Sequence, residues 1–306
     1  MALDLANKYR PKKLSQMVGQ PTAVAVIRGW IKRGKIPSAI LLSGPSGTGK
    51  TTLGRILKNH LQCPDDFGYE EINAADDKGI GMVRDILNRI QYKTLGGKPR
   101  LWFLDEIQET TKAAQNCILK VLEEPPPNTY FVLGTTETAG LLRTVRTRCK
   151  EIKLSPVDPG SITTLLQRVC AGEGVQVSKK VMAEIVELAD GSPRMALSKL
   201  EEVIGLDTEQ DMLEALTPEE TKAESIDLCR ALMRRAHWRD VAKIISKIKS
   251  DPERVRVGVL GYASSVLLSG KQSKTAHEIL IAFEDPFYNT MKNGLIRSSY
   301  DVCGGK

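Results

Sequence analysis

Residues 39–51 read AILLSGPSGTGKT, and this stretch decides the fold. The apolar run at 39–43 predicts a strand, and the sequence LGRILKNHL at 53–61 predicts a helix soon after it. The loop from Gly44 to Thr51 fits the pattern G-x-x-x-x-G-K-[ST]. A strand, a glycine-rich loop and a helix in this order predict a phosphate-binding loop.

The residue types of this loop suit a nucleoside triphosphate bound with magnesium. Glycines let backbone N–H groups turn inward around a phosphate, and the helix N-terminus adds a positive dipole. Lys50 neutralises the β- and γ-phosphate oxygens, and the Thr51 hydroxyl ligates Mg²⁺. The predicted cofactors are therefore ATP and Mg²⁺, and the predicted binding residues are Gly44, Pro45, Ser46, Gly47, Thr48, Gly49, Lys50, Thr51 and Thr52.

Two further strand ends carry candidate catalytic groups. The apolar run at 101–104 is followed by Asp105, which suits magnesium coordination, and by Glu106, which suits deprotonating an attacking water. The apolar run at 130–134 is followed by Thr135 and Thr136, where a polar side chain would lie between the two phosphate-binding strands. Simpler interpretations stay open, because 105–106 also fits an acidic helix cap and threonines are common strand formers.

Strands and helices alternate from residue 38 to about 154, and helical patterns alone follow. Strands are predicted at 39–43, 101–104, 130–134 and 151–154. Alternation of this kind predicts an α/β domain with a parallel sheet. The predicted domains are a nucleotide-binding α/β domain at 1–154, a helical lid domain at 155–206 and an all-helical, collar-like oligomerisation domain at 207–306.

Composition narrows the function classes. The formal net charge of +7 suits a polyanionic partner, although a basic, solvated surface would explain it equally well. No apolar run is long enough for a membrane span, and the N-terminus has no signal-peptide pattern, so we expect a cytoplasmic protein without a membrane partner. No two of the six cysteines form a CxxC pair, which argues against zinc and a disulfide framework.

Four further segments carry a family resemblance. They are KYRP at 8–11 with VGQ at 18–20, LEEPP at 122–126, TRC at 147–149 and GSPRMAL at 191–197. With these segments the chain resembles the AAA+ ATPases of sliding-clamp loaders: bacterial DNA polymerase III gamma/tau, the small subunits of replication factor C, and phage loaders. The ordered matches run from residue 8 to about 200. The cysteine-rich zinc module of gamma/tau chains is represented only by Cys63.

The resemblance implies roles that spacing does not show. Arg148 becomes an arginine finger that reaches the γ-phosphate of a neighbouring subunit, a contact that has raised rates by roughly 10³–10⁵ elsewhere. Thr136 becomes the first sensor and Arg194 a second sensor in cis, which couples nucleotide state to the angle between domains. The N-terminal segment is expected near the adenine, through Tyr9, Arg10, Pro11 and Val18. Judged without the family, Arg148 reads as a surface arginine at a helix end.

The resemblance also implies partners. They are other clamp-loader subunits in a ring of about five that includes further copies of this chain, a sliding clamp, and primer–template DNA. DNA phosphates are expected at two helix N-termini, marked by Lys78, Gly79 and Ile80 and by Thr111 and Lys112. Ordinary helix capping with solvated lysines explains those five residues as well. The setting implied is the cytoplasm of a prokaryote or of a phage-infected host, and the type is a small-subunit or phage loader.

Two other functions remain open. Another AAA+ motor, such as a branch-migration or replication-remodelling ATPase, would share the phosphate-binding loop, Asp105–Glu106 and Arg194, but would not be expected to carry LEEPP followed by TRC. A non-catalytic scaffold of the delta-prime type would lack working residues in the loop, and here Gly49, Lys50 and Thr51 are all present.

Overall fold

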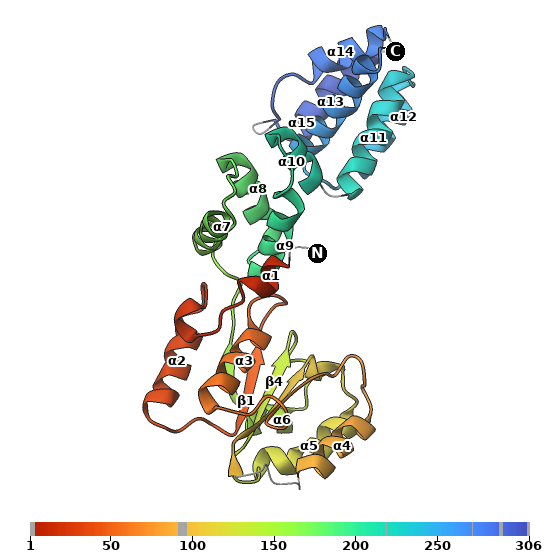
Figure 1. Ribbon diagram of the computed structural model, residues 1–306. Coiled ribbons are helices and arrows are strands. Elements are labelled where there is room, and N and C mark those ends of the chain that lie inside the picture. The colour runs from red at the N-terminus through yellow and green to blue at the C-terminus, as the bar shows by residue number, and fades with distance from the viewer. Residues whose placement is uncertain (1–3, 91–96, 218, 271, 288–289, 305–306) are drawn as a thin grey trace. The chain divides into compact units, whose positions relative to one another are not determined.

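A computed structural model describes residues 4–90, 97–217, 219–270, 272–287 and 290–304 of the chain. Contacts divide it into two compact units, residues 1–212 and residues 213–306. Figure 1 shows a sheet with helices in the first unit and helices in the second.

The first unit contains a five-stranded parallel sheet. Its strands are β1 (Ala39–Ser43), β2 (Tyr69–Asn73), β3 (Arg100–Asp105), β4 (Thr129–Thr135) and β5 (Lys150–Lys153). They lie in the order β2-β3-β4-β1-β5, and every neighbouring pair is parallel. All carboxyl ends therefore meet at one edge, and β4 lies between β1 and β3 as the sequence predicts.

Strand β2 was not among the predicted strands. Its sequence, YEEIN, carries no run of apolar residues, and each of its five residues is exposed or only partly buried. It lies at the edge of the sheet and pairs only with β3, from Tyr69 opposite Leu101 to Asn73 opposite Asp105. An edge strand with this composition has no hydrophobic signal to find, because it is held by its ladder to β3 rather than by burial.

Helices cover both faces of the sheet (Figure 1). The helices of this unit are α1 (Leu5–Lys8), α2 (Pro21–Lys32), α3 (Lys50–Leu61), α4 (Ile80–Ile90), α5 (Lys112–Glu123), α6 (Arg143–Arg148), α7 (Pro159–Glu173), α8 (Lys179–Ala189), α9 (Pro193–Val203) and the first half of α10 (Glu209–Leu216), with 3₁₀ turns η1 (Leu14–Gln16) and η3 (Ile107–Glu109). Trp102 and Leu104 pack in the apolar layer with α4 and α5, while Leu101 and Phe103 pack in the layer with α2 and α3. Burial on both faces explains why the central strands are continuous apolar runs.

The second unit is all helical. It contains α11 (Glu219–Met233), α12 (Trp238–Lys247), α13 (Pro252–Leu268), α14 (Lys274–Ala282) and α15 (Lys292–Cys303) around one apolar core. In that core the carboxylate of Glu253 accepts from Arg256 Nε at 2.8 Å and Nη2 at 2.6 Å, and from the Phe287 backbone N–H at 2.5 Å. Arg256 Nη1 also donates to the Phe283 carbonyl at 2.7 Å. This pair ties α13 to the chain that follows α14.

The described residues contain no helix that is both long and apolar enough to span a membrane.

We predict that Arg256→Ala destabilises the second unit by about 3–5 kcal/mol, because it leaves the buried Glu253 carboxylate without its partner. Arg235→Ala is the matched control, since Arg235 pairs with Glu278 at the surface, where such pairs contribute at most about 1 kcal/mol. The measurement is urea unfolding of the full chain, with hydrogen exchange of unit 2 peptides to assign the transition. Equal losses of unfolding free energy in the two variants would show that the buried ion pair stabilises the protein no more than the surface pair does.

Candidate nucleotide-binding site

The loop between β1 and α3 has a backbone that only glycine readily adopts. Gly47 has a φ of +75° and Gly49 a φ of +109°, both in the left-handed region. A Cβ on Gly47 would clash with Ser192 of the lid, and one on Gly49 would approach the Met17 methyl to 2.9 Å. The glycines thus allow both the turn and the close approach of neighbouring segments to it.

Lys50 begins α3 and is 6% exposed. Its Nζ donates to the Gly44 carbonyl at 2.8 Å and to the Pro45 carbonyl at 3.1 Å, which keeps the ammonium at the mouth of the loop. Burial lowers the pKa of Lys50, and the negative charges of Glu106 and Asp105 partly offset that effect. A buried cation facing two carboxylates is suited to an anionic ligand that carries its own metal ion.

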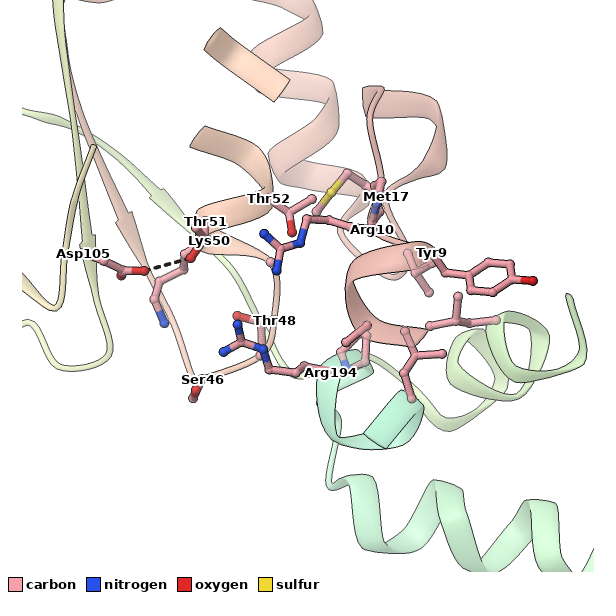
Figure 2. Close-up of a pocket in the computed structure, with 18 of the residues that line it drawn as sticks. Tyr9, Arg10, Met17, Ser46, Thr48, Lys50, Thr51, Thr52, Asp105 and Arg194 are labelled. Carbon is pink, nitrogen blue, oxygen red and sulfur yellow. Dashed lines mark hydrogen bonds between the residues drawn. The ribbon is translucent and has the colours of Figure 1, made fainter. Parts of the chain in front are cut away.

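A hydrogen bond joins the loop helix to the neighbouring strand β3. Thr51 Oγ1 donates to Asp105 Oδ2 at 2.8 Å, across 54 positions of sequence (Figure 2). Asp105 Oδ1 accepts from the Glu106 backbone N–H at 3.0 Å, which fixes the second carboxylate oxygen. A hydroxyl and a carboxylate at this separation form an oxygen pair of the kind that Mg²⁺ takes in phosphate sites.

Glu106 lies at the turn between β3 and η3, with a φ of +50°. Its Oε2 accepts from Gln108 Nε2 at 2.6 Å and from Thr136 Oγ1 at 3.1 Å. Thr136 directly follows β4, so the predicted first sensor contacts the predicted base. Gln108 was not among the predicted site residues, because a polar residue in a short turn carries no distinguishing pattern.

One pocket of the first unit collects most of the predicted binding residues (Figure 2). The predicted residues that line it are Tyr9, Arg10, Pro11, Val18, Ser46, Gly47, Thr48, Gly49, Lys50, Thr51, Thr52, Asp105, Glu106 and Arg194. Gly44 and Pro45 take part through their carbonyls, which hold Lys50. The lining residues that were not predicted are Ala6, Met17, Leu165, Pro193 and Leu197; Pro193 and Leu197 belong to the segment GSPRMAL, and the other three lie outside the motifs.

Two arginines enter this pocket from different segments (Figure 2). Arg10 belongs to the N-terminal segment, and its Nη1 is buried without a hydrogen-bond partner among the described residues. Burial lowers the pKa of Arg10, and the positive charges of Arg55 and Arg194 lower it further. Arg194 lies at the start of α9 in the lid region. An unsatisfied guanidinium nitrogen between like charges fits an anionic ligand such as a nucleotide phosphate.

Tyr9 fastens the N-terminal segment to the lid region. Its hydroxyl donates to Glu173 of α7, and that bond raises the pKa of Tyr9. Lys8 pairs with the same carboxylate at 2.8 Å. The segment that brings Arg10 and Pro11 to the pocket is therefore held by the last turn of α7.

Arg148 does not line the pocket, and it is paired within its own chain. It ends α6, and its Nη2 lies 2.9 Å from Glu123 Oε2 at the end of α5. Its Nη1 donates to the Thr144 carbonyl at 3.1 Å. The pairing arises because α5 packs against α6, a tertiary contact between LEEPP and TRC that the sequence does not show.

The two predicted DNA segments lie side by side. The Thr111 backbone N–H donates to the Lys78 carbonyl at 3.1 Å, which places the N-terminus of α5 beside the segment that leads into α4. Both lysines have contacts within the chain, since Lys78 pairs with Glu109 at 2.5 Å and Lys112 Nζ donates to the Gly140 carbonyl at 2.8 Å. The Thr111 hydroxyl caps α5, and Gly79 and Ile80 lead into and begin α4. Phosphate contact by these residues stays a prediction.

Sequence comparisons relate this chain to subunits of DNA polymerase III. The family model for the DNA polymerase III delta subunit matches residues 19–158. The gamma/tau subunit of Mycobacterium tuberculosis strain H37Rv is 32% identical over 222 residues, which is 65% of this chain and 38% of that protein. The gamma subunit of Buchnera aphidicola subsp. Schizaphis graminum is 30% identical over 224 residues, 66% of this chain and 61% of that protein. The chain therefore spans less than two thirds of the length of these relatives.

A solved structure shares the fold. The Holliday junction branch migration motor RuvB of Thermotoga maritima superposes with a TM-score of 0.58 at 19% identity, over 86% of this chain and 91% of that one. At that identity the likeness concerns the fold alone.

We predict that Gly134→Ala disturbs the Asp105 carboxylate without unfolding the sheet. A Cβ at this position of β4 would lie 2.5 Å from Asp105 Oδ1, and the end of a side chain can move where backbone cannot. Displacement of Asp105 breaks its bond to Thr51, so magnesium-dependent nucleotide binding should weaken about tenfold or more, while circular dichroism is unchanged. Gly81→Ala, where an added Cβ meets nothing within 4 Å, is the control. Equal magnesium dependence in the two variants would contradict the placement of Asp105.

Proposed function

Because this chain is a gamma/tau- and delta-like AAA+ subunit of the DNA polymerase III clamp-loader type, we propose that it binds ATP with Mg²⁺ and hydrolyses it as a motor subunit of a sliding-clamp loader in DNA replication. One observation carries the proposal. The hydrogen bond between Thr51 and Asp105 brings the loop and strand β3 together, with Lys50 and Glu106 in the same pocket. A binding scaffold has no need of Glu106 in that pocket.

Each site residue has a role that follows from its chemistry. Lys50 neutralises the β- and γ-phosphates, and the loop N–H groups and the start of α3 surround them. Thr51 and Asp105 hold the magnesium ion. Glu106 orients the attacking water and accepts its proton, and Thr136 hydrogen-bonds Glu106 Oε2. Magnesium, when bound, neutralises charge on the phosphate oxygens.

The lid region, residues 155–206, is proposed to change its position relative to residues 1–154 when a nucleotide binds. Arg194 comes from α9, while Lys50 comes from the loop that follows β1, so an anion in the pocket attracts both parts. The Tyr9–Glu173 bond joins the N-terminal segment to α7. We infer that these contacts draw the predicted domains 1–154 and 155–206 together when ATP binds and release them after hydrolysis.

A ring of subunits would explain the surface position of Arg148 and the exposed apolar residues of the second unit. Arg148 lies outside the pocket of its own chain, and its partner Glu123 is 59% exposed. A surface ion pair of this kind contributes little, so the guanidinium can exchange Glu123 for the γ-phosphate of a neighbouring subunit. The second unit carries a set of exposed apolar residues suited to oligomerisation: Val257, Leu268, Ile281, Met291, Ile296 and Tyr300. The proposed ring contains further copies of this chain with other subunits.

Partners follow from the same comparison. The ring is proposed to open a sliding clamp and place it on primer–template DNA in the cytoplasm of a bacterium or a phage-infected host. DNA phosphates would meet the adjacent N-termini of α4 and α5, with Lys78 and Lys112 released from their contacts within the chain. Such binding is sensitive to salt and nearly independent of sequence.

Two alternatives share the fold. A delta-like subunit that does not hydrolyse ATP is disfavoured by the presence of Lys50, Asp105 and Glu106 in one pocket. A branch-migration motor is favoured by the RuvB likeness in fold only, while the gamma/tau similarity extends over 222 residues.

We predict that Glu106→Gln binds ATP with wild-type affinity but hydrolyses it at least about a hundredfold more slowly, because the water loses its base. Lys50→Ala should abolish nucleotide binding itself while the protein stays folded. The measurements are fluorescent-nucleotide titration and single-turnover hydrolysis. A wild-type hydrolysis rate for Glu106→Gln would contradict the role of Glu106 as the base, whereas no hydrolysis by the wild-type protein in its assembled complex would favour a subunit that is not an ATPase.

We predict that Arg148→Ala leaves ATP binding by the isolated subunit intact and lowers hydrolysis in the assembled complex by about 10³-fold. The matched control is Arg146→Ala in the same helix α6. Mixing Arg148→Ala with Glu106→Gln subunits should restore part of the activity, because some interfaces then join a wild-type Glu106 to a wild-type Arg148. Normal hydrolysis by the assembled Arg148→Ala complex, in the presence of DNA and partner subunits, would refute a site shared between subunits.

A further inference from the structure

Gln108 is the polar residue in the first unit that contacts the candidate base most closely. It lies in η3, two residues after Glu106, and its amide nitrogen is 2.6 Å from Glu106 Oε2. The same nitrogen lies 3.0 Å from Thr136 Oγ1. Its amide oxygen lies 2.7 Å from the hydroxyl of Thr135, which is fully buried at the end of β4. Gln108 thus links the ends of β3 and β4.

The hydrogens of this cluster admit one arrangement of the Gln108 amide. Its two N–H groups donate to Glu106 Oε2 and to Thr136 Oγ1, and the Thr136 hydroxyl donates in turn to Glu106 Oε2 at 3.1 Å. Rotating the amide by half a turn would set its carbonyl oxygen against the Glu106 carboxylate and remove an acceptor from Thr135. Thr135 also lies 2.7 Å from the Glu137 carbonyl, so its proton is shared between two acceptors.

The hydrogen bonds that Gln108 and Thr136 donate to Glu106 end on the same carboxylate oxygen. Oε2 takes the hydrogen bonds of Gln108 and Thr136, and Oε1 receives none from the described part of the chain. The backbone supports this orientation, because the left-handed conformation of Glu106 fixes where its side chain leaves the turn. A carboxylate with one oxygen bound by two donors has one rotamer and presents the other oxygen.

We propose that Gln108 is a positioning residue for ATP hydrolysis, which holds Glu106 Oε2 so that Oε1 faces the attacking water. This proposal rests on the proposed function of the site. In the step it serves, the water oxygen forms a bond to the γ-phosphorus while the bond from that phosphorus to the β–γ bridging oxygen breaks. ADP leaves with the electron pair, and the water proton passes to Glu106 Oε1. Gln108 itself touches neither water nor nucleotide.

The decisive variant is Gln108→Met, which keeps the length of the side chain and removes its hydrogen bonds. We expect kcat to fall roughly 10- to 100-fold, on the scale of one lost hydrogen bond to a charged group, with KM and nucleotide affinity changed less than about twofold. Gln108→Glu is a second variant of nearly equal shape, and it should lower kcat further, because it sets a second carboxylate against Glu106. Gln176→Met is the matched control, an exposed glutamine in the connection between α7 and α8.

A double variant that also changes Glu106 distinguishes a positioning role of Gln108 from a packing role. In the Glu106→Gln background, Gln108→Met should cause no further loss of kcat, because the group it positions has been replaced. Additive losses in the double variant would overturn the proposal, as would a wild-type kcat in Gln108→Met while Glu106→Gln is inactive. A wild-type rate in Glu106→Gln itself would instead remove the proposed role of Glu106 as the base, and absence of hydrolysis by the wild-type complex would remove the proposed function. Equal loss of nucleotide affinity and of kcat in Gln108→Met would show a structural role and also overturn the proposal.

Discussion

The hydrogen bond from Thr51 to Asp105 is the contact on which the site depends. It exists because β1 and β3 end at the same edge of a parallel sheet with β4 between them. The loop that leaves β1 and the acids that leave β3 therefore meet at this edge. The sheet must be buried on both faces to hold this geometry, and the layers formed by α2 and α3 and by α4 and α5 provide that burial.

The positive charge gathered in the pocket is the second constraint on the site. Lys50, Arg10 and Arg194 converge on one pocket, and burial lowers the pKa of Lys50 and of Arg10. Cations held together in this way raise the free energy of the pocket until an anion enters it. These three cations come from separate segments of the first unit, since Arg194 belongs to α9, Lys50 begins α3 and Arg10 lies in the N-terminal segment.

Two glutamates, Glu106 and Glu123, take part in contacts within the chain that fix the position of a charged group. Glu106 is held by Gln108 and Thr136, and Glu123 holds Arg148 through a half-exposed ion pair. The first arrangement orients a group toward its own pocket. The second holds the Arg148 guanidinium at the surface through an ion pair of a kind that contributes little to stability.

The sequence by itself determined the nucleotide loop, the acids after β3, the parallel α/β class and four of the five strands of the sheet. These follow from local rules, because glycine at left-handed positions, apolar runs in buried strands and acids at strand ends depend only on neighbouring residues. Only the tertiary structure decided the edge strand β2, the role of Gln108 as a link between strand ends, the pairing of Arg148 with Glu123 and the apolar lining from Met17 and Leu165. Each of these depends on which segments pack side by side, and that is set by the burial of whole faces rather than by any residue pattern within one segment.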